Sequence, residues 1–158
     1  MEQRINHAAV APKWSLDLAA VGKETKEAIG GSLLHLVDIR ASQLNQCSFC
    51  LDMHSKEAKL KGERELKLYH IAAWPESNLF DARERAALAL TEHLTLNPSK
   101  GVSDELYNSV KQHFTDKEFV ALVYTIGLIN AWNRLSITFR PTPGAYDKIF
   151  GLDQAGLS

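Results

Sequence analysis

The sequence gives little sign of β-strands or of a surface that binds nucleic acid. Alternation of apolar and polar residues with a period of two, the mark of half-buried strands, is absent. Eighteen lysine and arginine residues are balanced by nineteen acidic residues, so the formal net charge is −1. This balance is not typical of proteins that bind nucleic acid or an anionic membrane. The 158 residues, 45% of them hydrophobic, suffice for one globular domain with a core.

Long apolar runs are also missing. The most apolar stretch, Phe119 to Trp132, is too short to span a bilayer, and Asn133 and Arg134 follow it at once. The first fourteen residues contain no apolar run that could serve as a signal peptide. We therefore expect a soluble cytoplasmic protein with no membrane partner.

Glycine, proline and capping residues divide the chain into segments with a helical pattern. Gly30-Gly31 breaks the first region into two helices, and Trp74-Pro75 is expected to end a later one. Asp81 with Glu84, and Thr115 with Glu118, have the spacing of capping boxes. A loop is expected at Asn97-Pro98 and Gly101. The expected helices cover residues 15–29, 32–45, 47–61, 63–73, 82–94, 104–113 and 116–139, so the sequence predicts one all-α domain over residues 1–158.

The last of these helices is apolar on nearly every side. Such a pattern indicates a central helix that is covered by its neighbours or by another subunit. We expect Tyr124 and Trp132 to pack in the core. Polar side chains in such a helix need partners, and we expect these to connect helices or subunits: Asn130, Asn133 and Arg134.

The only two cysteines of the chain stand three residues apart in the stretch NQCSFCLDMH, with a histidine after them. If Cys47 begins a helix, the free N–H groups at the start of that helix and the positive end of the helix dipole favour thiolate over thiol. Residues i and i+3 lie about 5 Å apart at Cα, within the range for a disulfide. His54, four residues after Cys50, shares this face and could accept a thiol proton. Glu57, one turn further on, could orient the imidazole.

Three interpretations of this stretch remain open. A redox dithiol would use an attacking thiolate, a resolving thiol and a base. A zinc site would take both cysteines and His54, with a fourth ligand from a histidine at position 7, 35, 70, 93 or 113, although the full zinc-finger spacing is missing. Two buried thiols beside an unrelated histidine would have no chemical role. In a reducing cytosol, a C-x-x-C pair is more often catalytic or metal-binding than a permanent crosslink.

With its flanks, the stretch resembles a known family. The segments LVDIRASQLNQCSFCLDMHSKEAKLKGE, WPESNLFDARERAALALTEHLT and INAWNRLSITFRPTPG are similar to the alkylhydroperoxidase D-like proteins, also called the carboxymuconolactone decarboxylase family. The resemblance covers roughly residues 33 to 144. It implies a single-domain helical bundle that forms homo-oligomers, often trimers or hexamers. Redox-active members of the family reduce organic hydroperoxides or hydrogen peroxide with the C-x-x-C pair.

The resemblance also implies a role for each site residue. Cys50 would be the peroxidatic thiol, Cys47 the resolving thiol, and His54 part of a proton relay. The family's hydroperoxidases carry a glutamate twelve residues before the first cysteine, and this position is His35 here. Asp38, one turn later, is a weaker candidate for the missing carboxylate.

Our first interpretation is a thiol-dependent peroxidase whose partners are a hydroperoxide substrate and an external dithiol reductant. Neither a metal nor an organic cofactor is implied. A decarboxylase or lactonase acting on a muconolactone-like acid is the alternative among enzymes, and it would have no need of a dithiol. A non-catalytic redox-sensing oligomer is the alternative from another class. A sensor is oxidised once, whereas a peroxidase consumes peroxide continuously when reductant is present.

Overall fold

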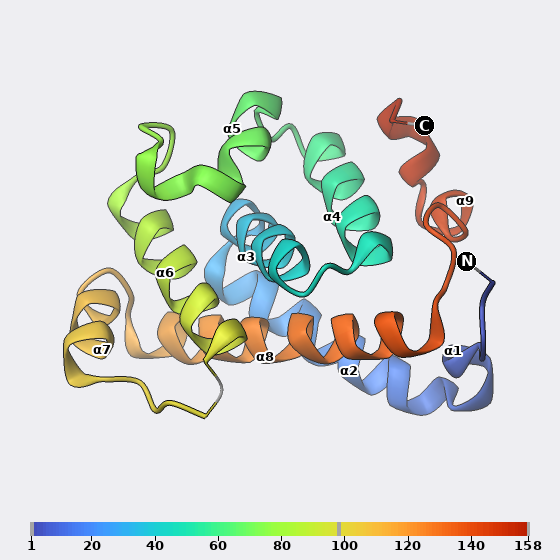
Figure 1. Cartoon of the computed structure of the whole chain (residues 1–158), viewed down its shortest axis with the longest axis horizontal. Helices are drawn as coiled ribbons and strands as arrows, with labels where there is room; N and C mark the ends of the chain where they lie inside the picture. The colour runs from blue at the N-terminus through green and yellow to red at the C-terminus, as the bar shows by residue number, and fades with distance from the viewer. Residues whose placement is uncertain (1, 98, 158) are drawn as a thin grey trace.

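The computed structural model describes residues 2–97 and 99–157, and the regular structure within these residues is helical without strands (Figure 1). The all-α prediction is therefore confirmed. The α-helices are α1 (His7–Val10), α2 (Pro12–Ile29), α3 (Gly31–Leu44), α4 (Ser48–Leu60), α5 (Glu65–His70), α6 (Ala82–Leu96), α7 (Asp104–Lys111), α8 (Asp116–Phe139) and α9 (Asp147–Phe150), and the 3-10 helices are η1 (Ile71–Glu76) and η2 (Leu152–Ala155).

Helix α3 occupies the centre of the bundle. It packs against α4 on one side, α6 on another and α8 below, while α2 lies along α8 (Figure 1). Leu36 and Ile39 of α3 belong to an apolar cluster with α4, η1 and α6, whereas Val37 and Ala41 belong to a second cluster with α2, α6, α7 and α8. Because both faces of α3 are covered, polar residues on this helix are also enclosed by protein.

Several helix ends follow the signals in the sequence. Both capping boxes form, at Asp81 with Glu84 and at Thr115 with Glu118. Gly30 separates α2 from α3 with a φ of 88°, a backbone conformation that glycine adopts without steric cost. Cys47 precedes the first residue of α4 as its N-cap.

One predicted helix end is wrong. The helix expected to stop before Trp74-Pro75 gives way at Ile71 to η1, which continues through Pro75 to Glu76. A break at Ala73, where φ is −118°, lets the chain change direction before the proline. Three short elements, α1, α9 and η2, lack the periodic pattern that would predict them. The loop predicted at Asn97-Pro98 falls partly outside the described residues, because Pro98 is not among them.

Helix α8 is only partly covered within one chain. Its buried residues include Leu122, Ile126 and Ile129, as its apolar pattern indicates. The expectation for Tyr124 is wrong, since 58% of this residue is exposed: it lines an open apolar groove beside Leu18 of α2, and the helices that pack on α8 leave it largely uncovered. Trp132 is half-buried. Within the described residues, no helix has the length and hydropathy needed to cross a membrane.

Candidate active site

The two cysteines lie at the start of α4 and are joined in a disulfide. Cys47 has extended backbone angles, and its Sγ accepts a hydrogen bond from the backbone N–H of Cys50 at 3.3 Å. The two Cα atoms are 5.4 Å apart, so the pair can close within the first turn of the helix. Cys47 and Cys50 are only 2% and 1% exposed.

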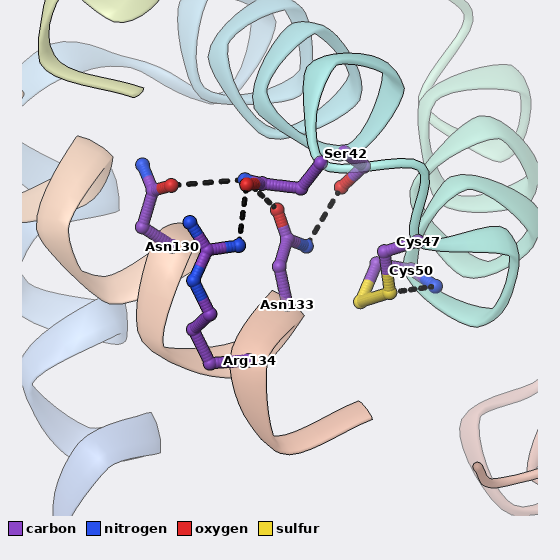
Figure 2. The surroundings of a disulfide bond; sticks show 7 residues. Ser42, Cys47, Cys50, Asn130, Asn133 and Arg134 are labelled. Atoms are coloured by element: carbon purple, nitrogen blue, oxygen red, sulfur yellow. Dashed lines mark hydrogen bonds between the residues drawn. A yellow bond between two sulfur atoms is a disulfide. The ribbon is translucent and has the colours of Figure 1, made fainter. Parts of the chain in front are cut away.

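Side chains of α3 and α8 hold the turn that leads into this disulfide (Figure 2). Asn45, at the end of α3, donates hydrogen bonds to the side-chain oxygens of Asn130 at 2.9 Å and Asn133 at 2.8 Å. Asn133 donates in turn to the hydroxyl of Ser42, and Arg134 donates to the side-chain oxygen of Asn45. The expectation that the three polar residues of α8 connect helices is thus confirmed. The network fixes α8 to the loop just before Cys47.

His54 lies one turn after Cys50 on α4 and is 9% exposed. Its Nδ1 is 3.4 Å from Oε2 of Glu57 and 3.6 Å from Oδ2 of Asp38. Lys26 of α2 completes the group, with its Nζ 3.2 Å from Oε1 of Glu57. Three helices therefore contribute to a cluster of two carboxylates, one imidazole and one ammonium group.

The cluster changes the acidity of each of its acidic and imidazole members. Burial raises the pKa of Asp38 to about 6, although the charge of His54 opposes this effect. The polar contact with His54 lowers the pKa of Glu57 to about 2. Burial alone would lower the pKa of His54, but Asp38 and Glu57 outweigh it, so this pKa lies above its ordinary value. The two carboxylates therefore make His54 a stronger base than a free imidazole.

His35 has different surroundings. It is 1% exposed, and neither of its ring nitrogens has a hydrogen-bond partner among the described groups. Burial lowers the pKa of His35, and the charge of Glu57 only partly offsets this. At neutral pH His35 is therefore predominantly neutral, and no hydrogen bond joins it to His54.

Reduction of the disulfide would place a thiol of Cys50 one helical turn from the basic imidazole of His54. At this i, i+4 spacing helical side chains meet, so the imidazole can take the thiol proton. The resulting thiolate is also favoured by the positive end of α4. The arrangement can thus generate a reactive thiolate beside a second sulfur that is already within disulfide distance.

Sequence reasoning located most of this group. It placed Cys47, Cys50 and His54 on one helix face, it suggested that Glu57 could orient the imidazole, and it gave Asp38 as a weaker candidate for the missing carboxylate. Lys26 was missed, because it lies on α2, twenty-one residues before Cys47, and no local spacing links it to the motif.

The zinc interpretation gains no partner from the other histidines. His70 Nδ1 lies 3.0 Å from the hydroxyl of Ser77, and His93 Nε2 lies 3.1 Å from the carbonyl oxygen of Gly101. Across residues 2–97 and 99–157, no three His, Cys, Asp or Glu side chains are grouped so that they could hold a metal ion.

Comparison with known proteins places this site in a family. The model of the carboxymuconolactone decarboxylase family matches residues 11–93, a range that contains both cysteines, His54 and the charged residues grouped around it. The uncharacterized protein YdfG of Bacillus subtilis strain 168 is 43% identical over 138 residues, which make up 87% of this chain and 94% of YdfG.

Two crystal structures resemble the fold. The protein ATU0492 of Agrobacterium tumefaciens, of unknown function and described as a proposed antioxidant defence protein AhpD, is 32% identical with a TM-score of 0.83; the match covers 89% of this chain and 97% of that one. An alkylhydroperoxidase AhpD core protein of Ralstonia eutropha JMP134, described as an uncharacterized peroxidase-related protein, is 19% identical with a TM-score of 0.72, over 86% and 74% of the two chains. At that identity the second likeness shows the fold alone.

Proposed function

The chain belongs to the carboxymuconolactone decarboxylase family, to which the alkylhydroperoxidase D-like proteins also belong, and on that premise we propose that it is a thiol-dependent peroxidase. The observation that carries the proposal is the Cys47–Cys50 disulfide at the start of α4, one turn from a buried histidine with two carboxylate neighbours. A decarboxylase would have no use for a reversible dithiol, so this site favours redox chemistry.

The oxidative half of the cycle begins at Cys50. His54 takes the thiol proton, and the Cys50 thiolate attacks one oxygen of the hydroperoxide. The O–O bond breaks, and the alcohol or water leaves with the proton that His54 held. Cys50 is left as a sulfenic acid. The Cys47 thiolate then attacks the Cys50 sulfur, hydroxide leaves as water on protonation, and the disulfide forms. An external dithiol reduces the disulfide and closes the cycle.

Cys50, and not Cys47, is assigned the attack on peroxide because of the position of the base. His54 is four residues from Cys50 and seven from Cys47, so it is one turn from the first and two turns from the second. The dipole of α4 acts on both sulfurs and cannot discriminate strongly between them.

Asp38 and Glu57 take the place of the single relay glutamate that the resemblance implies at position 35. Both act on His54, by raising its basicity and stabilising its protonated form. His35 is assigned a modulating role through its neutral ring. Replacing it by glutamate should keep or raise the peroxidase activity, since a further carboxylate would add to the basicity of His54.

The proposal includes a homo-oligomer, a trimer or hexamer, in the cytoplasm. Exposed apolar residues on the uncovered face of α8 support the assembly, among them Val120, Val123 and Tyr124. Light scattering or sedimentation at micromolar concentration measures the subunit number, and a monomer would contradict this part. A reducing compartment fits a dithiol that must be regenerated.

The decisive experiment is continuous peroxide consumption with a panel of dithiol reductants. The wild-type protein should turn over many equivalents, whereas Cys50→Ser should be inactive. Cys47→Ser should stop after one equivalent with a sulfenic acid on Cys50, which a dimedone-type trap and mass spectrometry can locate. Consumption of one equivalent by the wild-type protein with reductant present would indicate a redox sensor instead. A rapid adduct on Cys47 in Cys50→Ser, and none in Cys47→Ser, would reverse the assignment of the two thiols.

A further inference from the structure

A cleft of about 400 Å³ opens beside the disulfide, between the start of α4 and the end of α8. Its walls include Cys47 and Phe49 from the α4 side, and Ile137, Arg140 and Pro143 from the end of α8 and the segment that follows. Cys47 lines the cleft and Cys50 does not. A molecule that enters the cleft therefore approaches the disulfide from the Cys47 side, where 2% of that residue is exposed.

Arg140 is the one charged residue that lines this cleft. Arg40 and Arg83 elsewhere in the chain are paired with glutamates, but no acidic group of the described residues pairs with Arg140. It is the C-cap of α8 with φ 54° and ψ 55°, a left-handed conformation for which glycine is the usual residue. The chain thus keeps a cationic side chain at a position where the backbone favours glycine.

The backbone around the cleft adds to this positive charge. The first N–H groups of α4, at Ser48 and Phe49, have no partner within the helix, and the positive end of its dipole lies here. At the end of α8, Arg4 donates to the carbonyl oxygens of Thr138 and Phe139 through its side chain and its backbone N–H. These bonds occupy the last two carbonyl oxygens of α8, at the negative end of that helix, so Arg140 remains the one charged group at the cleft. The cleft favours an anion.

We propose that the cleft binds a small thiol reductant that carries a carboxylate, with the carboxylate on Arg140 and the thiol directed at Cys47. This inference rests on the proposed function, because it describes the step that restores the dithiol. A cleft of this volume lies at the small end of the range for ligand pockets, which suits a low-molecular-weight thiol. The positive charge of Arg140 makes the cleft bind an anionic reductant in preference to a neutral one.

The exchange proceeds in balanced steps. The thiolate of the reductant attacks the Cys47 sulfur, a new S–S bond forms, and the Cys47–Cys50 bond breaks with Cys50 as the leaving thiolate. Protonated His54, one turn away, stabilises that thiolate and can return its proton. A second thiol, from the same or another reductant molecule, then attacks the reductant sulfur and releases Cys47. Two reductant thiols are oxidised to a disulfide, and the protein gains two thiols. The reductant thus attacks Cys47, which lines the cleft, and Cys50 leaves, because His54 stabilises its thiolate.

The test compares two reductants that differ only in charge, 3-mercaptopropionate and 3-mercaptopropionamide. The rate constant for reduction of the oxidised protein is measured with each, by alkylation of the free thiols and mass spectrometry at low ionic strength. In the ratio of the two rate constants, changes in the reactivity of the disulfide that are common to both reductants cancel. We expect this ratio to fall about threefold in Arg140→Gln, the effect of a partly exposed ion pair, and to recover in Arg140→Lys. Lys117→Gln removes an exposed charge at the opposite end of α8 and should leave the ratio unchanged.

Two results would overturn the inference. One is a ratio that Arg140→Gln leaves at the wild-type value, or that Lys117→Gln lowers by the same factor. The other is a mixed disulfide that fragmentation mass spectrometry, after acid quenching, locates on Cys50 instead of Cys47. The assay contains no peroxide, so it is separate from the proposed function. If the wild-type protein does not turn over peroxide but thiol exchange depends on Arg140, the proposed peroxidase function is refuted and the proposed reductant site in the cleft stands.

Discussion

His54 and His35 are both buried, on adjacent helices near the same cysteine pair, yet their surroundings have opposite effects. Nδ1 of His54 faces the carboxylates of Asp38 and Glu57, and its pKa is raised. Neither ring nitrogen of His35 has a described partner, and burial lowers its pKa. The same side chain is thus a strong base in one place and a neutral ring in the other, because of the charges that reach it.

The comparison shows that a position in a motif does not by itself assign a role. The resemblance places the relay carboxylate at position 35, where this chain has a histidine. The structure supplies two carboxylates to His54 from elsewhere, one from α3 and one from α4 itself. His54 thus contacts carboxylates although position 35 carries none, so His54 and His35 should respond very differently to substitution.

The largest difference should be in the reaction with peroxide. His54→Gln removes the proposed base for the thiol proton, so the rate constant for oxidation of reduced Cys50 at neutral pH should fall about 100-fold. His35→Gln removes a neutral ring whose nitrogens have no hydrogen-bond partner, and it should cost less than about tenfold. Stopped-flow tryptophan fluorescence or a competition assay measures both. Equal losses in the two variants, with circular dichroism unchanged, would mean that His35 belongs to the relay.

A second difference should be in the pH dependence of Cys50. Glu57→Gln and Asp38→Asn each remove a carboxylate that raises the pKa of His54. With a lower pKa, His54 is protonated to a smaller extent and stabilises the Cys50 thiolate less. The pKa of the Cys50 thiol should therefore rise by about one unit in either variant. The rate of iodoacetamide alkylation of the reduced protein, measured against pH, gives this pKa.

Glu65→Gln provides the matched control for these two substitutions. Glu65 pairs with Lys59 of α4 but has no contact with His54. If Glu65→Gln moved the alkylation profile as far as Glu57→Gln, the effect would be one of overall charge and not of the contact with His54.

The sequence was sufficient for the fold class and for the residues that lie on one helix. The spacing of Cys47, Cys50 and His54 determines their shared face, because α4 has a regular period that nothing interrupts. The capping boxes of α6 and α8 are equally local signals. Contacts between helices carry no such signal. Lys26 meets Glu57 through the packing of the bundle, and Arg140 reaches the Cys47 cleft across ninety-three residues of chain. Neither contact follows from periodicity.

The stability of the oxidised protein should also distinguish the two histidines. The pKa of His54 is raised in the folded state. The contribution of His54 to the free energy of unfolding is therefore fully present below pH 6.5 and is lost as the pH rises through the folded pKa. The pKa of His35 is lowered in the folded state. The contribution of His35 to the free energy of unfolding is therefore present above pH 6.5 and is lost as the pH falls through the folded pKa.

Urea unfolding at about pH 5.5 and about pH 8.5 therefore gives opposite trends. The free-energy difference between wild type and His54→Gln should be larger at the lower pH, and that between wild type and His35→Gln should be larger at the higher pH, each by about 1 kcal/mol. Trends of the same sign for both histidines would contradict the opposite pKa shifts.

The smallest effect is expected when His35 is replaced by methionine. Methionine is apolar, adaptable in shape and close to histidine in size, so it can fill the same space. A buried polar group without partners contributes little or nothing to stability, and replacing it by an apolar group can be nearly neutral. The free energy of unfolding of His35→Met should thus lie within about 1 kcal/mol of the wild-type value. Leu36→Ala, at the next position and fully buried, is the control and should cost about 3 kcal/mol. Guanidinium unfolding of the oxidised proteins measures both. A loss in His35→Met as large as that in Leu36→Ala would show that the His35 ring nitrogens do have partners in solution, and His35 would then resemble His54.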